Sequence, residues 1–248
     1  MTVLIAIPYY GVPADMIDKA VRHALAQTHS ETIVMVLGDG QKPPVSFTHD
    51  RLIVDMIPEH HGAPFVQQAM ILGSPFEWYA PHGADDWIEP DHIKSLLALG
   101  ARVNGSGVIW YDQAGKRPQL FRSSRTYIEF GVLDTSMLRA IGGYNAAEPC
   151  GQDSVLISLL AQTEVVRLSR RPTYHKVHRA DSLTHHPDTR GGSPLRTGVR
   201  IRNRAILLEC ARKGRDRVAI KDYRASLLSP EVAGALEDAA ALVARRLT

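Results

Sequence analysis

Cysteine is scarce in this sequence, and long apolar runs are missing. Only Cys150 and Cys210 occur among the 248 residues, and they form neither a CxxC pair nor a regular framework. A disulfide scaffold or a zinc knuckle is therefore not expected, and both thiols should be reduced. No stretch approaches the roughly 18 consecutive apolar residues of a membrane-spanning helix, and the N-terminus runs directly into an apolar segment instead of a signal sequence. These absences predict a cytoplasmic protein.

A strong net charge is also missing, since the formal balance is only +3. Basic residues nevertheless concentrate in residues 196–224, where ten Lys and Arg side chains face only Glu209, Asp216 and Asp222. This pattern predicts either a solvated helix face or a peripheral surface that holds an anionic membrane, polymer or phosphate. Nucleic-acid binding is not expected as the main function, because no platform of interleaved aromatic residues accompanies the basic cluster.

Apolar runs alternate with segments of helical periodicity in the first half of the chain. The pattern predicts strands over residues 2–7, 31–37, 52–57 and 77–80, with helices over residues 14–27 and 64–72. Such alternation is typical of an α/β fold whose mainly parallel sheet is covered on both faces. Ligands of these sheets gather at the carboxyl ends of the strands. Pro8, Tyr9 and Tyr10 should therefore share one rim with Asp39 and the pair Asp85-Asp86.

The second half of the chain mixes strands and helices. Strands are predicted over residues 107–111, 118–121, 164–168 and 173–177, and helices over residues 135–141, 152–161, 195–213 and 230–246. The helix over residues 135–141 stops at Gly142-Gly143, which is the usual place for a left-handed C-terminal cap.

Adjacent carboxylates follow the predicted strand over residues 77–80, at Asp85 and Asp86. Mg²⁺ and Mn²⁺ prefer oxygen ligands and are usually held by one or two carboxylates together with substrate phosphates. A divalent cation at this position is one interpretation of the pair. A solvated turn or a helix cap is the other.

Several short motifs occur along the chain in an order that is typical of one enzyme family. The sequence opens with Val3-Leu4-Ile5-Ala6-Ile7-Pro8-Tyr9-Tyr10, continues with Ala26-Gln27-Thr28 and Leu37-Gly38-Asp39-Gly40, and later has Gly142-Gly143-Tyr144-Asn145, Gln152-Asp153 and Tyr174-His175-Lys176-Val177-His178. In their order and spacing, over residues 2 to 185, these motifs resemble the inverting family 2 glycosyltransferases. The resemblance implies a GT-A type α/β fold, a Rossmann-like and mostly parallel sheet flanked by helices.

The resemblance also implies roles for individual residues. Pro8, Tyr9 or Tyr10 would shape the pocket for the nucleotide base, and Asp39 would accept a hydrogen bond from the base. Asp85 would touch the ribose or the metal, and Asp86 would coordinate a metal that bridges the diphosphate. Asp153 matches the catalytic base, and His178 matches a histidine near the metal or the diphosphate. The remaining donor-binding positions are Gln67, Gly143 and Tyr144.

A chain with these residues is expected to transfer a sugar from a UDP-, GDP- or dTDP-linked donor to an acceptor hydroxyl with inversion, assisted by Mn²⁺ or Mg²⁺. The acceptor would be a glycan, a protein or a lipid-linked molecule. The catalytic domain would cover residues 1–194, with a nucleotide-binding half over residues 1–104 and an acceptor half over residues 105–194. Residues 195–248 would form a helical extension packed on the same domain.

The chain departs from the family pattern at three places. Gly83 stands where relatives often carry the first Asp of the acidic motif, Gln67-Gln68 replaces Arg-Asn, and Gln152 replaces the Glu before the proposed base. A non-catalytic nucleotide-sugar or glycan-binding protein with a degenerate site is therefore a second interpretation. A sugar nucleotidyltransferase is a third, although the segment Tyr9 to Pro13 lacks the Gly-rich, basic phosphate loop of that class.

Histidine and tryptophan residues near these motifs have alternative interpretations. His60, His61, His175, His185 and His186 fit no zinc spacing, so solvated loop histidines are expected. Trp87, beside the acidic pair, would either pack against a sugar or plug the loop as a hydrophobic anchor.

Overall fold

The computed structural model covers the 248-residue chain and describes most of it. Residues 112–118, 122–127, 129, 151–152, 178, 180–186, 188, 191 and 215 lie outside the described residues, and only the backbone is described for residues 119–121 and 153–154.

The centre of the fold is one mixed sheet with the strand order β3-β2-β1-β4-β8-β6-β9-β5, and β7 pairs with β6 at its side. Its first four members, β1 (Val3–Tyr9), β2 (Thr32–Asp39), β3 (Leu52–Ile57) and β4 (Trp78–Pro81), run parallel. The others are β5 (Trp87–Ile88), β6 (Val103–Tyr111), β7 (Gln119–Phe121), β8 (Val132–Asp134) and β9 (Val166–Val177). Strand β8 is antiparallel to both β4 and β6, so it joins the parallel part to the rest.

The apolar runs of β1 and β2 reflect burial on both faces of the sheet. In β1 the side chains of Leu4 and Ala6 enter one core cluster, whereas Val3, Ile5 and Ile7 enter the other, and all five are fully buried. Successive strand residues point to opposite faces, so a strand covered on both sides needs an uninterrupted apolar run. The expected α/β fold is confirmed by this arrangement.

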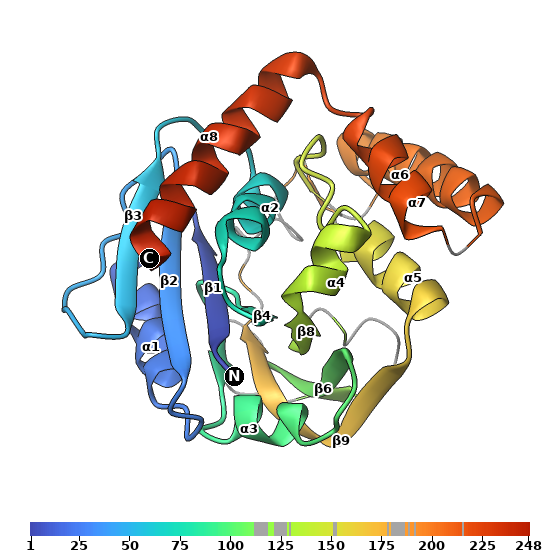
Figure 1. Ribbon diagram of the computed structural model, residues 1–248. Coiled ribbons are helices and arrows are strands. Elements are labelled where there is room, and N and C mark those ends of the chain that lie inside the picture. Colours follow the sequence, from blue (N-terminus) through green and yellow to red (C-terminus); the bar gives the residue numbers. More distant parts are fainter. Residues whose placement is uncertain are drawn as a thin grey trace.

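Helices cover the two faces of the sheet unequally. The face toward Ile5 carries α1 (Ala14–Leu25) and α3 (His92–Leu97). The opposite core includes residues of α2 (Ala63–Gly73), α4 (Thr135–Ala140), α5 (Asp153–Thr163), α6 (Pro194–Arg212), α7 (Arg217–Ala225) and α8 (Pro230–Leu247). Figure 1 shows α8 lying along α2 and beside β3. No helix in the described ranges is long and apolar enough to cross a membrane.

Close contact between α2 and α8 depends on a small residue. A Cβ atom at Gly73 would lie 2.4 Å from the carbonyl oxygen of Ala240 and 2.7 Å from Cβ of Val243, so no side chain fits there. Val243 is fully buried in this contact. The last helix therefore packs directly on the sheet-covering helix α2.

Two expectations about elements in the second half are wrong. The strands expected over residues 164–168 and 173–177 form the single strand β9, which β6 pairs along most of its length with an irregularity near Pro172. Helix α7 lies between the two expected C-terminal helices; Asp216 caps it by accepting from the backbone N–H of Ala219 at 3.0 Å. The expected left-handed end of α4 is confirmed, with φ of +83° at Gly142 and +58° at Gly143.

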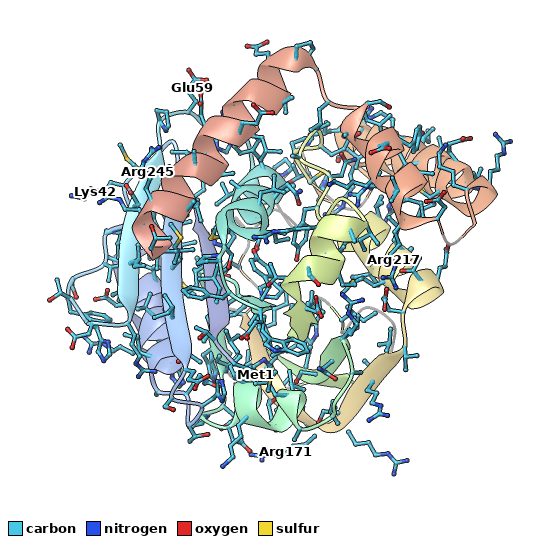
Figure 2. All side chains as sticks on the ribbon, in the orientation of Figure 1. Met1, Lys42, Glu59, Arg171, Arg217 and Arg245 are labelled. Atoms are coloured by element: carbon cyan, nitrogen blue, oxygen red, sulfur yellow. The ribbon has the colours of Figure 1, made fainter. Side chains whose placement is uncertain are left out.

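Several basic residues of segment 196–224 pair with other groups of the protein, although many of the basic side chains in this segment are exposed. Arg202 binds Glu148 with two hydrogen bonds of 2.5 and 2.7 Å, and Arg212 and Lys213 pair with Glu209. Arg217, the first residue of α7 (labelled in Figure 2), pairs with Glu164. Arg224 is buried and donates to the carbonyl of Ile141 at 2.6 Å. Arg217 and Arg224 thus join α7 to the ends of α5 and α4, and a peripheral anionic surface stays a prediction.

Candidate active site

The carboxyl ends of the parallel strands bring the proposed binding residues to one rim. Within the sheet Tyr9, at the end of β1, is level with Gly38 of β2, next to Asp39. Pro81 ends β4 beside β1, and the acidic pair follows four residues later. Pro8 is the residue of β1 before Tyr9 and pairs with Leu37. The rim expected from the strand pattern is therefore formed by β1, β2 and β4.

Asp39 is buried and binds the loop that leads into α2. Its two carboxylate oxygens accept the backbone N–H groups of His61 and Gly62, each at 2.8 Å, and His60 Nδ1 lies 2.9 Å from Oδ2. Gly62 has a φ of +100°, in the left-handed region that favours glycine. The carboxylate thus fixes the start of α2, and the hydrogen bond that Asp39 would accept from a nucleotide base stays a prediction.

Tyr9 and Tyr10 differ in exposure. Tyr9 is 3% exposed and donates its hydroxyl to the carbonyl of Val12 at 3.0 Å; burial raises its pKa, and nearby Arg179 opposes that rise. Tyr10 is 58% exposed, and its ring stacks on His60 with centroids 4.1 Å apart. Of the two, Tyr10 offers an aromatic face on which a planar ligand can stack.

The acidic pair is held by the end of β9. Asp86 is 2% exposed; its Oδ2 accepts from the hydroxyl of Tyr174 at 2.8 Å, and its Oδ1 accepts from the backbone N–H of Val177 at 2.9 Å. Lys176 Nζ lies 3.7 Å from Asp86 Oδ2, and Arg179 Nη1 lies 3.4 Å from Asp85 Oδ2. Each carboxylate therefore has a cation beside it.

Burial changes the protonation of groups at this corner. Burial, together with the charge of Asp86, raises the pKa of Asp85 to about 6, although Lys176 and Arg179 oppose the rise. His82 is 3% exposed, and burial lowers its pKa to about 4, so its imidazole is neutral at pH 7. The charges that face the rim here are those of the two carboxylates and the two cations.

Gly83 leaves no space for a further carboxylate. A Cβ atom at this position would lie 2.3 Å from Asp86 Oδ2 and 2.8 Å from Asp86 Cγ. The backbone N–H of Gly83 donates to the Tyr174 hydroxyl at 2.9 Å, which in turn donates to Asp86. The missing first Asp of the acidic motif is thus replaced by close packing of the segment against Asp86 and Tyr174.

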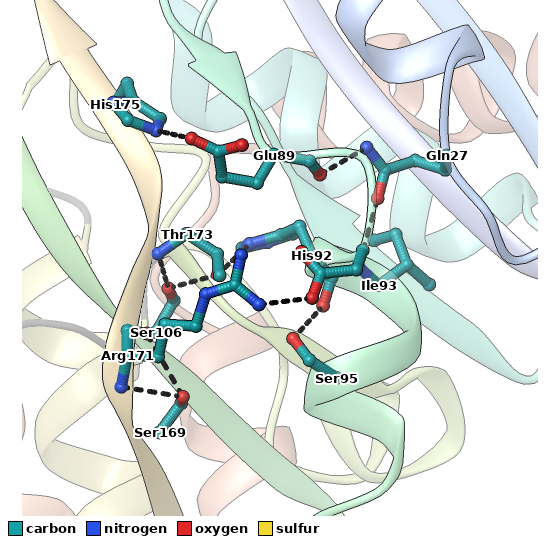
Figure 3. A network of polar contacts seen from close by, with 11 residues as sticks. Gln27, Glu89, His92, Ile93, Ser95, Ser106, Ser169, Arg171, Thr173 and His175 are labelled. Atoms are coloured by element: carbon teal, nitrogen blue, oxygen red, sulfur yellow. Dashed lines mark hydrogen bonds and ion pairs between the residues drawn. The ribbon is translucent and has the colours of Figure 1, made fainter.

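His175 and Trp87 form a cluster on the side of β9 away from Asp86. The expectation of a solvated loop is wrong for His175: it is 6% exposed in β9, where Nε2 lies 2.7 Å from Glu89 Oε1 (Figure 3). Its ring stacks on Trp87 with centroids 5.2 Å apart, and Lys19 Nζ lies 3.6 Å from the centre of the Trp87 ring. Trp87 therefore anchors the segment, in agreement with the plug interpretation.

The other proposed donor residues lie in α2 or next to it. Gln67 is 7% exposed, and its side chain accepts from the hydroxyl of Tyr79 in the core. Gln68 accepts from the backbone N–H of Tyr144 at 2.8 Å. A Cβ atom at Gly143 would lie 2.0 Å from Gln68 Oε1, so this contact requires glycine. Gln68, which was not among the proposed site residues, thus joins α2 to the segment after α4; a polar residue within an otherwise apolar helix was the available signal.

The side chains of the predicted base, Asp153, and of the predicted metal-proximal histidine, His178, lie outside the described part of the structure. Asp153 is the first residue of α5, but its side chain is outside the described part of the structure. His178 lies outside the described residues altogether. The base and the metal-proximal histidine therefore stay predictions.

The described residues around Asp86 already contact both of its carboxylate oxygens. Among the described residues no three His, Cys, Asp or Glu side chains are grouped to hold a metal ion, although Mg²⁺ is commonly held by one or two carboxylates together with substrate phosphates. Both oxygens of Asp86 accept protein hydrogen bonds, and an ammonium group stands beside one of them. The expected Mn²⁺ or Mg²⁺ at Asp86 and His178 stays a prediction.

Comparison with known proteins places the fold but gives no sequence family. No protein-family model matches the chain, and no curated protein sequence matches it. Among solved structures it resembles S. aureus TarS 1–349 in complex with UDP-GlcNAc, with a TM-score of 0.59 and 12% identity, over 73% of this chain and 60% of that one. The complex of TarS 1–349 with UDP gives a TM-score of 0.57, 13% identity, and coverage of 73% and 61%. The chain thus spans about three fifths of these neighbours, and the likeness defines a GT-A type α/β fold.

Proposed function

We propose that this protein is a glycosyltransferase that binds a nucleoside-diphosphate sugar at the rim and transfers the sugar to an acceptor hydroxyl. The observation that carries the proposal is the convergence of Tyr10, Asp39 and Asp85 at the carboxyl ends of β1, β2 and β4, respectively, in a GT-A type fold. Ligands of open α/β sheets bind at this edge. The two TarS neighbours hold UDP or UDP-GlcNAc, which makes a UDP-sugar the first donor to test.

In this proposal the base stacks on the exposed Tyr10–His60 pair, and the ribose lies toward Asp85. The side chain of Asp85 is 19% exposed, whereas that of Asp86 is 1% exposed, so Asp85 is the more accessible carboxylate. Asp153 removes the proton from the acceptor hydroxyl, and a single displacement inverts the anomeric carbon. A glycan, a protein and a lipid-linked molecule are the acceptor classes to test.

Stacking on Tyr10 predicts a specific loss of nucleotide affinity. Tyr10→Ala should weaken UDP binding about tenfold, since stacking of a base on an aromatic ring contributes about 1–3 kcal/mol. Tyr10→Phe retains the ring and should bind as the wild type does. Isothermal titration with UDP, GDP and dTDP measures both effects and selects the base; equal affinities of wild type and Tyr10→Ala would contradict this placement.

Catalysis by Asp153 separates a transferase from a binding protein. Asp153→Asn should reduce sugar transfer about 10²- to 10⁴-fold, the range contributed by a general base, while UDP binding is retained. Release of UDP from a panel of UDP-sugars with acceptors of the three classes gives the rate. The non-catalytic alternative has one observation in its favour, the closed packing at Gly83, and it predicts nucleotide binding without turnover that depends on Asp153.

A further inference from the structure

The end of β9 brings two cations to the acidic pair. Lys176 is close to Asp86 and Arg179 to Asp85, and the side chains of these cations are 27% and 12% exposed. The two carboxylates and two cations balance in formal charge. A divalent cation that approached Asp86 would have to displace an ammonium group and compete with the donors Tyr174 and Val177.

The close packing at Gly83 also opposes a divalent cation at Asp86. The atoms of Asp86 occupy the space that a side chain at position 83 would need, with 2.3 Å between a Cβ there and Asp86 Oδ2. A carboxylate cannot be added at this position without moving the segment. The acidic motif is thus packed as part of a charge-balanced cluster.

Arg179 also lies toward the nucleotide side of the rim. It is near Asp85, after β4, and its charge acts on Tyr9, at the end of β1. The guanidinium group can bind two phosphate oxygens at once, and a lysine ammonium acts as a compact point charge beside a phosphate. These two groups therefore stand where the diphosphate of a donor at the rim would lie.

We propose that Lys176 and Arg179 offset the charge of the donor diphosphate, so that nucleotide binding does not require a divalent cation. The inference rests on the proposed function, because it assigns these side chains to a donor bound at the rim. When the diphosphate binds, both cations turn from their carboxylates toward the phosphate oxygens. Lys176 and Arg179 would then hold the leaving group during transfer.

Titration of the full-length protein with UDP, in EDTA and separately in MnCl₂, tests the inference. The expected result is the same dissociation constant in both buffers within about twofold. Binding in MnCl₂ alone would overturn the inference and leave the proposed function intact. Absence of UDP binding in both buffers would overturn the proposed function, and the inference with it.

Charge-removing variants identify the cations. Lys176→Met and Arg179→Gln should each weaken UDP binding about tenfold or more in EDTA, while uridine, which has no phosphate, binds as it does to the wild type. Arg171→Gln is the matched control, since Arg171 is another ion-paired cation of β9, bound to Asp91 and 63% exposed at its side chain. An equal loss for UDP and uridine would assign the two residues a structural role and overturn the inference.

Discussion

Asp39 and Asp86 are both buried carboxylates beside the ends of parallel strands, but they are held in different ways. Asp39 accepts backbone N–H groups that lie 22 and 23 residues further along the chain. Asp86 accepts groups that lie 88 and 91 residues away, in β9, and it has an ammonium group beside it. The Asp39 corner is therefore built locally around a loop, whereas the Asp86 corner joins distant parts of the chain through charge. Removal of the Asp86 carboxylate should consequently lower the free energy of unfolding more than removal of the Asp39 carboxylate.

Asp86→Ala is expected to have the largest effect. The variant leaves the buried Tyr174 hydroxyl and the Val177 N–H without their acceptor, and Lys176 without its carboxylate. Removal of one partner from such a buried charged cluster costs about 3–5 kcal/mol of unfolding free energy. Urea unfolding measures the loss. Asp86→Asn, which retains an acceptor oxygen, is the control and should lose less; a loss below about 1 kcal/mol for Asp86→Ala would contradict the description of this corner.

Asp39→Ala should have a smaller effect on stability. Two backbone N–H groups, those of His61 and Gly62, lose a charged acceptor, and an unsatisfied buried donor costs about 1–3 kcal/mol. We expect a loss of about 2 kcal/mol in the same urea experiment, since water can reach the exposed His60 side of the loop. Asp39→Asn should recover part of it. A greater loss for Asp39→Ala than for Asp86→Ala would reverse the comparison.

The smallest expected change in the free energy of unfolding comes from Asp85, and this change depends on pH. Its pKa is raised to about 6 in the folded protein, above the value of about 3.9 expected in the unfolded chain. The folded state therefore binds the proton more tightly, so this contribution to stability is present below about pH 4 and is lost as the pH rises through about 6. His82, with its pKa lowered to about 4, acts in the opposite direction.

The contribution of Asp85 is isolated by comparison with Asp85→Asn. Between pH 4 and pH 7 the wild type should lose about 1–2 kcal/mol of unfolding free energy relative to this variant, as measured by urea unfolding at each pH. The contribution of His82 is present in both proteins and cancels in the difference. A difference that is constant across this range would show that the folded-state pKa of Asp85 is not raised.

The local corner is also the part that could be predicted from the sequence. The apolar run of β1, Asp39 at the end of β2 and the glycine before α2 are short-range features, and they placed the rim correctly. The position of His175 could not be predicted, because its burial depends on the pairing of β5 with β9. The same pairing, between segments far apart in the chain, brings Lys176 to Asp86. Periodicity within one segment carries no information about such a contact.

Helix α7 was missed for a different reason. Its sequence from Arg217 to Ala225 is short and strongly polar. Its buried side chains are those of Ile220 and Arg224, and Arg224 donates a hydrogen bond to the carbonyl of Ile141. Its nine residues are fewer than the roughly 11–18 over which helical periodicity is recognised. The cap at Asp216 was the remaining signal for its start.

A crystal structure of the protein grown with UDP tests the central claim most directly. The account predicts the uracil stacked on Tyr10 beside His60, the ribose near Asp85, and the diphosphate between the ends of β1 and β4. Nucleotide bound elsewhere on the molecule, with the rim unchanged, would contradict the assignment of this edge of the sheet as the donor site.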